Sequence, residues 1–360
     1  MALTNLDQPT QIRPNEGFDE NSLKTFLINE LNLIEGIIKI SQFPSGFSNL
    51  TYLVNFNGKD FVLRRPPIGA NIKSGHDMNR EYTILNGLKK IYNKVPKPYI
   101  YSDNLKIIGA PFYLMERKKG IILRGNTPKK QLPDKLDMRK LSKEFIFTLA
   151  EIHRLNYKKA GLENIGKPKG YISRQVKGWI NRYLASKTSD ISHINYVYKW
   201  LERNIHENKF SSLIHNDFKY DNLVLSDDGK YDVLAILDWE MATLGDPLMD
   251  LGTSLGYWID KTDPENIQQN KFNITTAEGN LNRGELVSKY SKESKLDVSN
   301  IVFYYVFGLF KIAVIVQQIF YRYKLGKTTD ERFKNLNEIV KIYGLMAKRA
   351  IDKNSIDNLF

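Results

Sequence analysis

Hydrophobic and polar positions follow two different patterns along the chain. Residues 18–117 hold short apolar runs separated by turn residues, together with helical spacing, which predicts a small antiparallel sheet with helices. Its strongest turn signal is Asn57-Gly58, a pair that favours the two-residue turn of a β-hairpin. Residues 118–360 are mostly helical in pattern, and residues 1–17 predict an extended arm. The sequence therefore predicts an α+β fold with a β-rich N-lobe and a larger helical C-lobe.

Apolar spacing also locates individual elements. We expect helices over residues 19–31, 76–92, 141–153 and 172–184, and strands over residues 50–56, 61–64 and 111–115. A nearly continuous apolar segment at residues 301–321 is long enough to cross a membrane. Because Lys311, Gln317 and Gln318 within it would be costly in lipid, we interpret this segment as the core helix of the helical lobe.

Composition narrows the class of protein. Hydrophobic residues at 42% and charged residues at 26% of 360 are typical of a globular protein. The absence of cysteine excludes zinc ribbons, iron–sulfur clusters, thiol catalysis and disulfides. No signal peptide is visible in the first 20 residues, so we expect a cytoplasmic location. The net charge of +13 allows an anionic partner, but the basic residues are scattered, and we expect neither a nucleic acid nor a membrane as partner.

Residues 211–251 carry the candidate chemistry. Two short apolar runs separated by Asp227-Asp228-Gly229 predict a hairpin. Asn222 precedes the first strand and Asp238 follows the second, so both side chains lie at the open end of the hairpin, one short loop away from Asp217. Converging oxygen ligands favour Mg²⁺, which usually shares its coordination shell with substrate phosphates. A third acid is then available to orient a hydroxyl nucleophile.

Other polar residues of this region have structural interpretations. Nine acidic residues and two lysines between Asp217 and Asp250 give a local charge of −7 within a basic chain. We interpret Asp227 and Asp228 as turn residues. We expect Asp246 and Asp250 to cap and brace a following helix, and His153 and His215 to be hydrogen-bonded core residues.

Several segments resemble the aminoglycoside phosphotransferase and choline kinase superfamily, whose members are similar to protein kinases in fold. The resemblance implies a bilobal kinase-like fold and transfer of a phosphoryl group from ATP, or alternatively GTP, to a small-molecule hydroxyl with Mg²⁺. The strongest similarity is to the kinase-like domain found alone in bacteria and fused to some eukaryotic acyl-CoA dehydrogenases. The matching segments are HNDFKYDN, ILDWE, GDPLMDL, SGFSNLTYLV, FVLRRPP, REYTIL, YLMER and SRQVKGW.

The resemblance also assigns roles by position. Asp217 matches the catalytic aspartate, and Asn222 and Asp238 match the Mg²⁺ ligands. Glu81 matches the helix glutamate that pairs with the phosphate-binding cation. The phosphate-covering loop holds Ser45, Gly46, Ser48 and Asn49, and the connector that would read adenine through backbone groups holds Met115, Glu116 and Arg117.

One position departs from the usual kinase pattern. Where kinases usually place a strand lysine on the phosphates, this chain offers Arg64, which the acyl-CoA dehydrogenase-linked group shares and which can contact phosphate in a bidentate way. Lys59 and Arg65 are the alternatives for this contact.

The acceptor is expected to be anionic. The helix at 172–184 carries cations beside Gln175 and Trp179, and Lys311 lies inside the apolar segment, where a charge needs a partner or a ligand. A hydroxyacyl-CoA fits both the charge and the resemblance. An antibiotic phosphotransferase and a nucleotide-binding pseudokinase are the alternatives, and surface salt bridges are the alternative role for the helix cations. Those cations are Arg174, Lys177 and Arg182.

Overall fold

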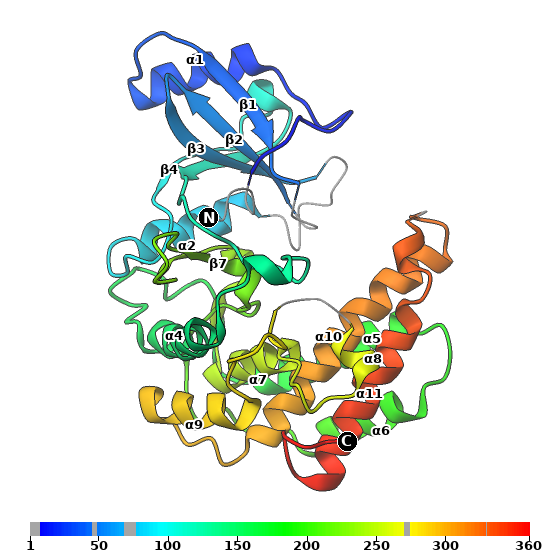
Figure 1. Ribbon diagram of the computed structural model, residues 1–360. Coiled ribbons are helices and arrows are strands. Elements are labelled where there is room, and N and C mark those ends of the chain that lie inside the picture. The colour runs from blue at the N-terminus through cyan, green and yellow to red at the C-terminus, as the bar shows by residue number, and fades with distance from the viewer. Residues whose placement is uncertain (1–7, 45–48, 68–76, 270–273, 329) are drawn as a thin grey trace. The chain divides into compact units, whose positions relative to one another are not determined.

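The computed structural model describes residues 8–44, 49–67, 77–269, 274–328 and 330–360. The chain forms two compact units (Figure 1). The first comprises Met1–Ile122, Asn156–Ile165 and Asn222–Ala242, and the second comprises Leu123–Leu155, Gly166–Asp221 and Thr243–Phe360.

An antiparallel five-stranded sheet forms the centre of the first unit, with strand order β1-β2-β3-β5-β4. A second, two-stranded sheet in the same unit pairs β7 with β8. The strands are β1 (Ile38–Gln42), β2 (Leu50–Phe56), β3 (Lys59–Arg65), β4 (Pro98–Ser102), β5 (Phe112–Glu116), β7 (Leu223–Leu225) and β8 (Val233–Ile236). The helices are α1 (Glu20–Leu31), α2 (Met78–Leu88), α3 (Leu105–Ile108) and the 3₁₀ helix η3 (Trp239–Met241).

Local sequence signals explain the first elements. Asp19 caps α1 by accepting hydrogen bonds from the backbone N–H groups of Asn21 and Ser22. Asn57 and Gly58 have positive φ angles of 49° and 82°, as a two-residue hairpin turn requires, and the predicted hairpin between β2 and β3 is confirmed. Within the predicted arm, Thr10 pairs with Gln42 of β1 through two backbone hydrogen bonds, so this part of the chain extends the sheet edge.

Alternation along β3 separates a hydrophobic face from a polar contact. Phe61 and Leu63 are buried in a cluster that includes side chains of α1 and α3. Arg64 lies on the opposite face of the strand, because successive strand residues point to opposite sides. Its partner Glu81 comes from the first turn of α2. The alternation of the strand therefore places Arg64 on the face opposite the cluster with α1 and α3.

The second unit is mainly helical. Its strands β6 (Ser212–Ile214) and β9 (Thr243–Gly245) form an antiparallel pair. The predicted helix at 141–153 begins earlier, at Lys135, because Asp134 caps the backbone N–H groups of Leu136 and Asp137. The helices are α4 (Lys135–Arg154), α5 (Tyr171–Ser186), α6 (Ser192–Arg203), α7 (Pro247–Tyr257), α8 (Glu265–Gln268), α9 (Arg283–Ser294), α10 (Ile301–Lys324) and α11 (Leu336–Lys353). The 3₁₀ helices are η1 (Lys129–Gln131), η2 (Tyr220–Asn222) and η4 (Glu331–Phe333). The last residue of η2, Asn222, already belongs to the first unit.

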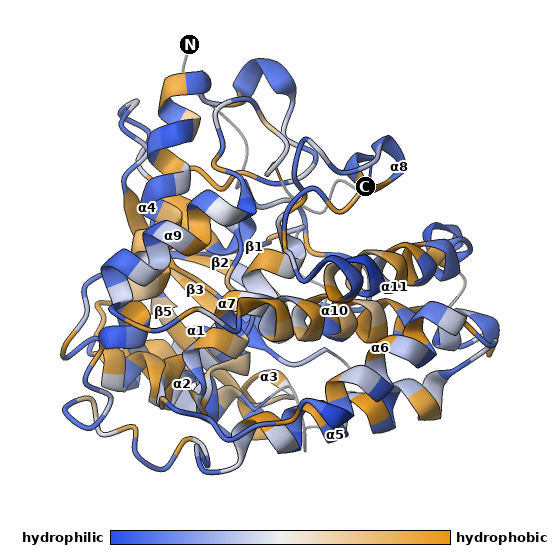
Figure 2. Ribbon diagram, turned by 90° about the horizontal axis from the view of Figure 1, so that it is seen from below, coloured by the Kyte–Doolittle hydropathy of each residue, from blue (hydrophilic) through white to orange (hydrophobic). Residues whose placement is uncertain are grey.

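Helix α10 is the core helix of the second unit. It packs against α7 and α11, and Figure 2 shows its hydrophobic colouring along most of its length. A Cβ atom at Gly252 of α7 would lie 2.1 Å from the carbonyl oxygen of Tyr304, so glycine permits the close approach of α7 and α10. Among the described residues, α10 alone is long and apolar enough to cross a membrane, but 78% of its most apolar window is buried. This burial agrees with the interpretation of residues 301–321 as a core helix.

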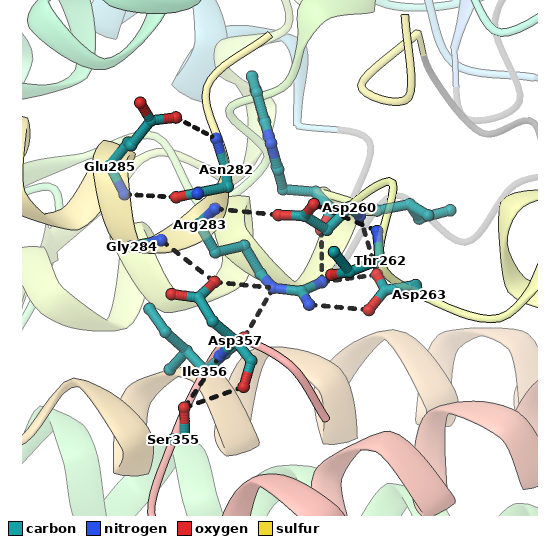
Figure 3. A network of polar contacts seen from close by, with 12 residues as sticks. Asp260, Thr262, Asp263, Asn282, Arg283, Gly284, Glu285, Ser355, Ile356 and Asp357 are labelled. Carbon is teal, nitrogen blue, oxygen red and sulfur yellow. Dashed lines mark hydrogen bonds and ion pairs between the residues drawn. The ribbon is translucent and has the colours of Figure 1, made fainter. Parts of the chain in front are cut away.

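A buried arginine joins three segments of the second unit (Figure 3). The Arg283 guanidinium is fully buried and donates two hydrogen bonds to Asp263, at 2.7 and 2.8 Å. It also donates to the carbonyl oxygen of Trp258 at 3.1 Å and, near the C-terminus, to that of Ile356 at 2.8 Å. These hydrogen bonds take the place of the bonds to water that the groups lose on burial. The cluster therefore holds the segment after α7 and the residues near the C-terminus against the start of α9.

We expect Arg283→Met to lower the free energy of unfolding by about 3–5 kcal/mol, because it leaves the Asp263 carboxylate buried without its partner. Urea-induced unfolding followed by tryptophan fluorescence measures this change. Arg332→Met is the matched control, because Arg332 is exposed and pairs with Asp330 at the surface, and we expect it to leave unfolding unchanged. Equal unfolding curves for the two variants would show that the cluster is not stabilising.

Candidate active site

The β7–β8 hairpin carries the predicted cation ligands within the first unit. The backbone N–H of Leu237 donates to the carbonyl oxygen of Asn222 at 2.8 Å. Asn222 is thus paired with the residue directly before Asp238, which puts both at the open end of the hairpin, as predicted. At the opposite end, Asp228 accepts hydrogen bonds from the Ser226 hydroxyl and the Lys230 backbone, which confirms its role in the turn. Asp238 has a positive φ of 67° at the start of η3.

Arg64 is bonded to the carboxylate that follows this hairpin. Its guanidinium donates to Glu81 at 2.7 Å and to Asp238 at 2.9 Å, and it lies 3.5 Å from Glu240. Burial raises the pKa of the Glu81 carboxyl, and the nearby Arg64 charge offsets part of that rise. Glu81 also accepts a hydrogen bond from the backbone N–H of Trp239 at 3.1 Å. The fork-shaped guanidinium thereby connects β3, α2 and the segment after β8.

The two alternative cations lie elsewhere in the first unit. The Lys59 ammonium lies over the rings of Phe61 and Tyr99, at 5.1 and 5.5 Å from their centroids. Arg65 donates to the carbonyl oxygen of Ile108 at 3.1 Å, on the side of the sheet that faces the α1 cluster. Arg64 is therefore the one of these three cations that contacts both Glu81 and Asp238. Its contact with nucleotide phosphate stays a prediction.

Part of the predicted nucleotide loop and the connector can be placed. Ser45, Gly46 and Ser48 lie outside the described residues, whereas the Asn49 side chain donates to Glu240 at 2.6 Å. Met115 is buried in β5. Glu116 accepts a hydrogen bond from the backbone N–H of Lys97 at 3.0 Å, and Arg117 pairs with Asp60 at 3.1 Å. These side chains brace the connector, and its reading of adenine through backbone groups stays a prediction.

Asp250 holds the loop that bears Asp217 in the second unit. Its carboxylate accepts hydrogen bonds from the backbone N–H groups of His215, at 2.6 Å, and Asn216, at 2.8 Å. Burial alone would raise the pKa of Asp250, but the contact with His153 at 3.2 Å and the interactions with His215 outweigh it and lower this pKa. His153 and His215 are buried and hydrogen-bonded, which confirms their predicted core roles.

A lysine beside Asp217 was missed in the sequence. The Lys219 ammonium lies 3.1 Å from one carboxylate oxygen of Asp217 and 3.9 Å from Asp221. Burial alone would lower the pKa of Lys219, but the two carboxylates outweigh it and raise the pKa. The available signal was its position two residues after Asp217, in a segment with only one other lysine. Glu240, which binds Asn49 and Arg64, was missed in the same way within the quoted ILDWE segment.

The predicted acceptor residues divide into two groups. Lys311 is buried in α10 and donates to the carbonyl oxygen of Asn216 at 2.8 Å. Its ammonium lies 5.8 Å from the ring centroid of Trp179, whose indole N–H donates to Gln175 at 3.3 Å. Arg174, near the start of α5, instead donates to the carbonyl oxygens of Lys167 and Lys169 in the segment before that helix. The structure thus brings Lys311, Trp179 and Gln175 together in the second unit, with Lys311 bonded to the residue before Asp217.

The donor set at the hairpin suits a hard cation. Asn222 and Asp238 offer amide and carboxylate oxygens, which Mg²⁺ prefers. In the described part of the chain, no group of three or more His, Cys, Asp and Glu side chains could hold a metal. Two protein ligands suit Mg²⁺, because it keeps several waters and substrate phosphates in its shell. Asp217 belongs to the second unit and the hairpin pair to the first, so their convergence stays a prediction.

A buried ion pair between a strand cation and a helix glutamate, and an aspartate in a separate loop, are features found in kinase-like folds. Solved structures confirm this fold. A Ralstonia eutropha protein assigned to the aminoglycoside phosphotransferases is 26% identical, with a TM-score of 0.78 over 94% of this chain and 99% of that one. Choline kinase from Cryptosporidium parvum is 14% identical, with a TM-score of 0.66 over 95% and 98%.

The chain belongs to the phosphotransferase enzyme family, which matches residues 39–274. It is also 33% identical over 329 residues to acyl-CoA dehydrogenase family member 11 of Pongo abelii. That alignment covers 89% of this chain and 42% of the relative. The chain therefore spans less than half the length of the curated relatives named acyl-CoA dehydrogenase family member 11. The predicted family and the predicted α+β bilobal fold are confirmed.

We expect Asp250→Asn to speed amide hydrogen exchange at His215 and Asn216 by about ten- to a hundredfold, because hydrogen bonds to a charged acceptor contribute about 1.5–3 kcal/mol. Residue-resolved hydrogen exchange measures the change. Thr253→Val is a matched control on α7, since the buried Thr253 hydroxyl donates to Met249 within the helix. Unchanged exchange in Asp250→Asn would contradict the bracing role.

Proposed function

We propose that this protein transfers the γ-phosphoryl group of ATP to a hydroxyl group of a small molecule. The observation that carries the proposal is the buried Arg64 guanidinium, which is bonded to both Glu81 and Asp238. A cation held by a helix glutamate next to an aspartate is the arrangement with which kinases bind nucleotide phosphates and their metal. The braced loop with Asp217 supports the same proposal from the second unit.

Asp217 acts on the acceptor hydroxyl in this proposal. Its carboxylate orients the hydroxyl and takes its proton while the oxygen forms a bond to the γ-phosphorus. The bond between the γ-phosphorus and the bridging oxygen breaks, and ADP leaves with the electron pair. Asn222 and Asp238 would hold Mg²⁺, which supplies neutralisation of phosphate charge when it is bound. Arg64 adds a permanent cation for the phosphates, because a guanidinium keeps its proton at working pH.

Lys219 has a role beside the base. Its ammonium is 3.1 Å from Asp217 and carries a raised pKa, so it stays charged at neutral pH. The ion pair holds the Asp217 carboxylate in one orientation, which a base requires. The same ammonium is a source of positive charge for the phosphoryl group in transfer.

The proposed acceptor is anionic, with a hydroxyacyl-CoA as the leading compound. In the second unit the Arg182 guanidinium lies 4.7 Å and the Lys311 ammonium 5.8 Å from the centroid of the Trp179 ring. Lys219 of the same unit lies beside Asp217. An aromatic face with nearby cations suits a carbonyl compound with phosphate groups better than a polycationic aminoglycoside. The name of the relative, acyl-CoA dehydrogenase family member 11, points to acyl-CoA chemistry for that protein and supports this acceptor class here.

Site variants test the phosphotransferase reaction. We expect Asp217→Asn to lower kcat by about 10²–10⁴-fold with little change in KM for ATP, because it removes the base alone. Asp238→Asn should raise the Mg²⁺ concentration for half-maximal activity by about tenfold or more, since loss of even outer-shell partners costs that much. Steady-state kinetics with varied ATP and Mg²⁺ measures both changes.

Asp227→Asn is the control for these variants, because Asp227 is an exposed turn residue at the far end of the hairpin. It should behave like the unmodified protein. Nucleotide binding without Mg²⁺-dependent phosphoryl transfer to any acceptor would instead support a nucleotide-binding pseudokinase.

An acceptor screen tests the substrate class. We expect phosphorylation of hydroxyacyl-CoA thioesters and no turnover of kanamycin, with product formation followed by mass spectrometry. Arg182→Gln should raise KM for the thioester by about tenfold and leave KM for ATP unchanged, because it removes one charged contact. Arg322→Gln, at an exposed position at the end of α10, is the matched control. Turnover of kanamycin but not of thioesters would make the protein an antibiotic phosphotransferase.

A further inference from the structure

Lys311 is a buried cation that is bonded directly to the catalytic loop. It lies in the middle of α10 with 3% of its surface exposed, and its ammonium donates to the carbonyl oxygen of Asn216 at 2.8 Å. That carbonyl belongs to the peptide bond that leads into Asp217. A charged donor makes this hydrogen bond stronger than a neutral amine would. The longest buried helix of the second unit thereby contacts the residue before the proposed base.

Asn216 needs such support because its backbone is strained. Its φ of 69° lies in the left-handed region, which residues other than glycine adopt at a cost. Three groups hold it there, each from a different helix. Asp250 of α7 accepts its N–H, Tyr171 of α5 donates to its side-chain oxygen at 3.2 Å, and Lys311 of α10 binds its carbonyl oxygen.

The charge of Lys311 is conditional. Burial lowers its pKa to about 8, although the carboxylates of Asp217 in the catalytic loop and Asp250 on α7 raise it in part. Lys219 in the same loop and Arg182 on α5 add to the lowering. Lys311 thus differs from Asp250 and Tyr171, the other two residues bonded to Asn216. Its charge, and with it the strength of its hydrogen bond, changes within the pH range in which enzymes work.

We propose that Lys311 is a positioning residue that holds the Asn216–Asp217 peptide in the geometry for phosphoryl transfer only while it carries a proton. The proposal rests on the proposed function and adds a regulation of the same site, namely an alkaline limit set by a residue that does not touch the substrate. Loss of the proton weakens the bond to Asn216 and removes a positive charge near the Asp217 carboxylate. Phosphoryl transfer then declines while nucleotide binding in the first unit is retained.

The pH dependence of kcat tests this role. We expect kcat of the unmodified protein to fall above pH 8 towards the level of the Lys311→Met variant, with KM for ATP unchanged. Lys311→Arg should move the decline to higher pH, because a guanidinium stays charged. Lys311→Met should lower kcat at neutral pH by about tenfold or more and remove this limb of the profile. The same alkaline limb in all three proteins would overturn the proposal.

Gln317→Met is the matched control. Gln317 is also buried on α10 and donates to a backbone carbonyl oxygen, that of Ser186, at 2.8 Å. The variant exchanges a buried polar side chain for methionine on the same helix but does not touch the catalytic loop. It should keep the pH profile of the unmodified protein. If Gln317→Met lost the alkaline limb as Lys311→Met does, the effect would belong to α10 packing and the proposal would fail.

Unfolding measurements test the titration without any kinase activity. A lysine whose pKa is lowered to about 8 in the folded protein, against 10.5 for an unperturbed lysine, makes the unfolded chain bind more protons between these values. The free energy of unfolding of the unmodified protein should therefore rise relative to that of Lys311→Met as pH rises from 8 to 10.5. Activity and stability thus change in opposite directions over this range. No relative gain in stability would overturn the titration of Lys311.

Amide hydrogen exchange separates this proposal from the proposed function. If no acceptor is phosphorylated, the phosphotransferase proposal fails, but exchange at Asp217 still reports on the loop. After correction for the intrinsic pH effect, exchange at this amide should speed up above pH 8 in the unmodified protein and not in Lys311→Met. An equal pH response in both proteins would overturn the positioning role.

Discussion

A charged side chain that leaves water must find partners within the protein, and this constraint places the main residues of the candidate site in both units. In the first unit Arg64 and Glu81 are nearly fully buried, and each supplies the opposite charge that the other needs away from water. In the second unit the Asp250 carboxylate is buried because two backbone N–H groups and His153 take the place of water. The loop that bears Asp217 is thus held in position by the donors that the buried Asp250 carboxylate requires.

The number of acceptors around a buried cation determines whether arginine or lysine suits that position. Arg64 contacts Glu81 and Asp238 at once, which a planar fork with five donors can do and a lysine ammonium on a flexible stem does poorly. The usual kinase lysine serves one glutamate and the phosphates. An arginine at this position is therefore compatible with the proposed nucleotide binding, and its contact with Asp238 joins the cation proposed for the phosphates to a proposed Mg²⁺ ligand. Arg283 shows the same preference, with two bonds to Asp263 and two to backbone carbonyls.

The parts of the structure that could be predicted from sequence are those determined by neighbours in the chain. The Asn57-Gly58 turn and the β7–β8 hairpin depend on residues within about 20 positions of one another, and both formed as predicted. The Asn222 and Asp238 positions at one end of the hairpin followed from strand lengths alone. In contrast, the pairing of Arg64 with Asp238 joins residues 174 positions apart, and the bond of Lys311 to Asn216 joins residues 95 apart. No spacing in the sequence selects such partners.

Arg64, buried in the first unit, and Lys311, buried in the second, differ in how permanent their charge is. Burial alone would lower the pKa of Arg64, but its carboxylate partners raise it well above that of a free arginine, so no working pH removes its charge. Lys311 has a neutral carbonyl as its hydrogen-bond acceptor, and its pKa of about 8 leaves its charge dependent on the medium. The difference arises from the partner, since a carboxylate stabilises a buried cation far more than a carbonyl dipole does. In the proposed function, nucleotide binding would therefore rest on a constant charge, whereas the alignment of Asp217 would rest on one that a modest rise in pH can remove.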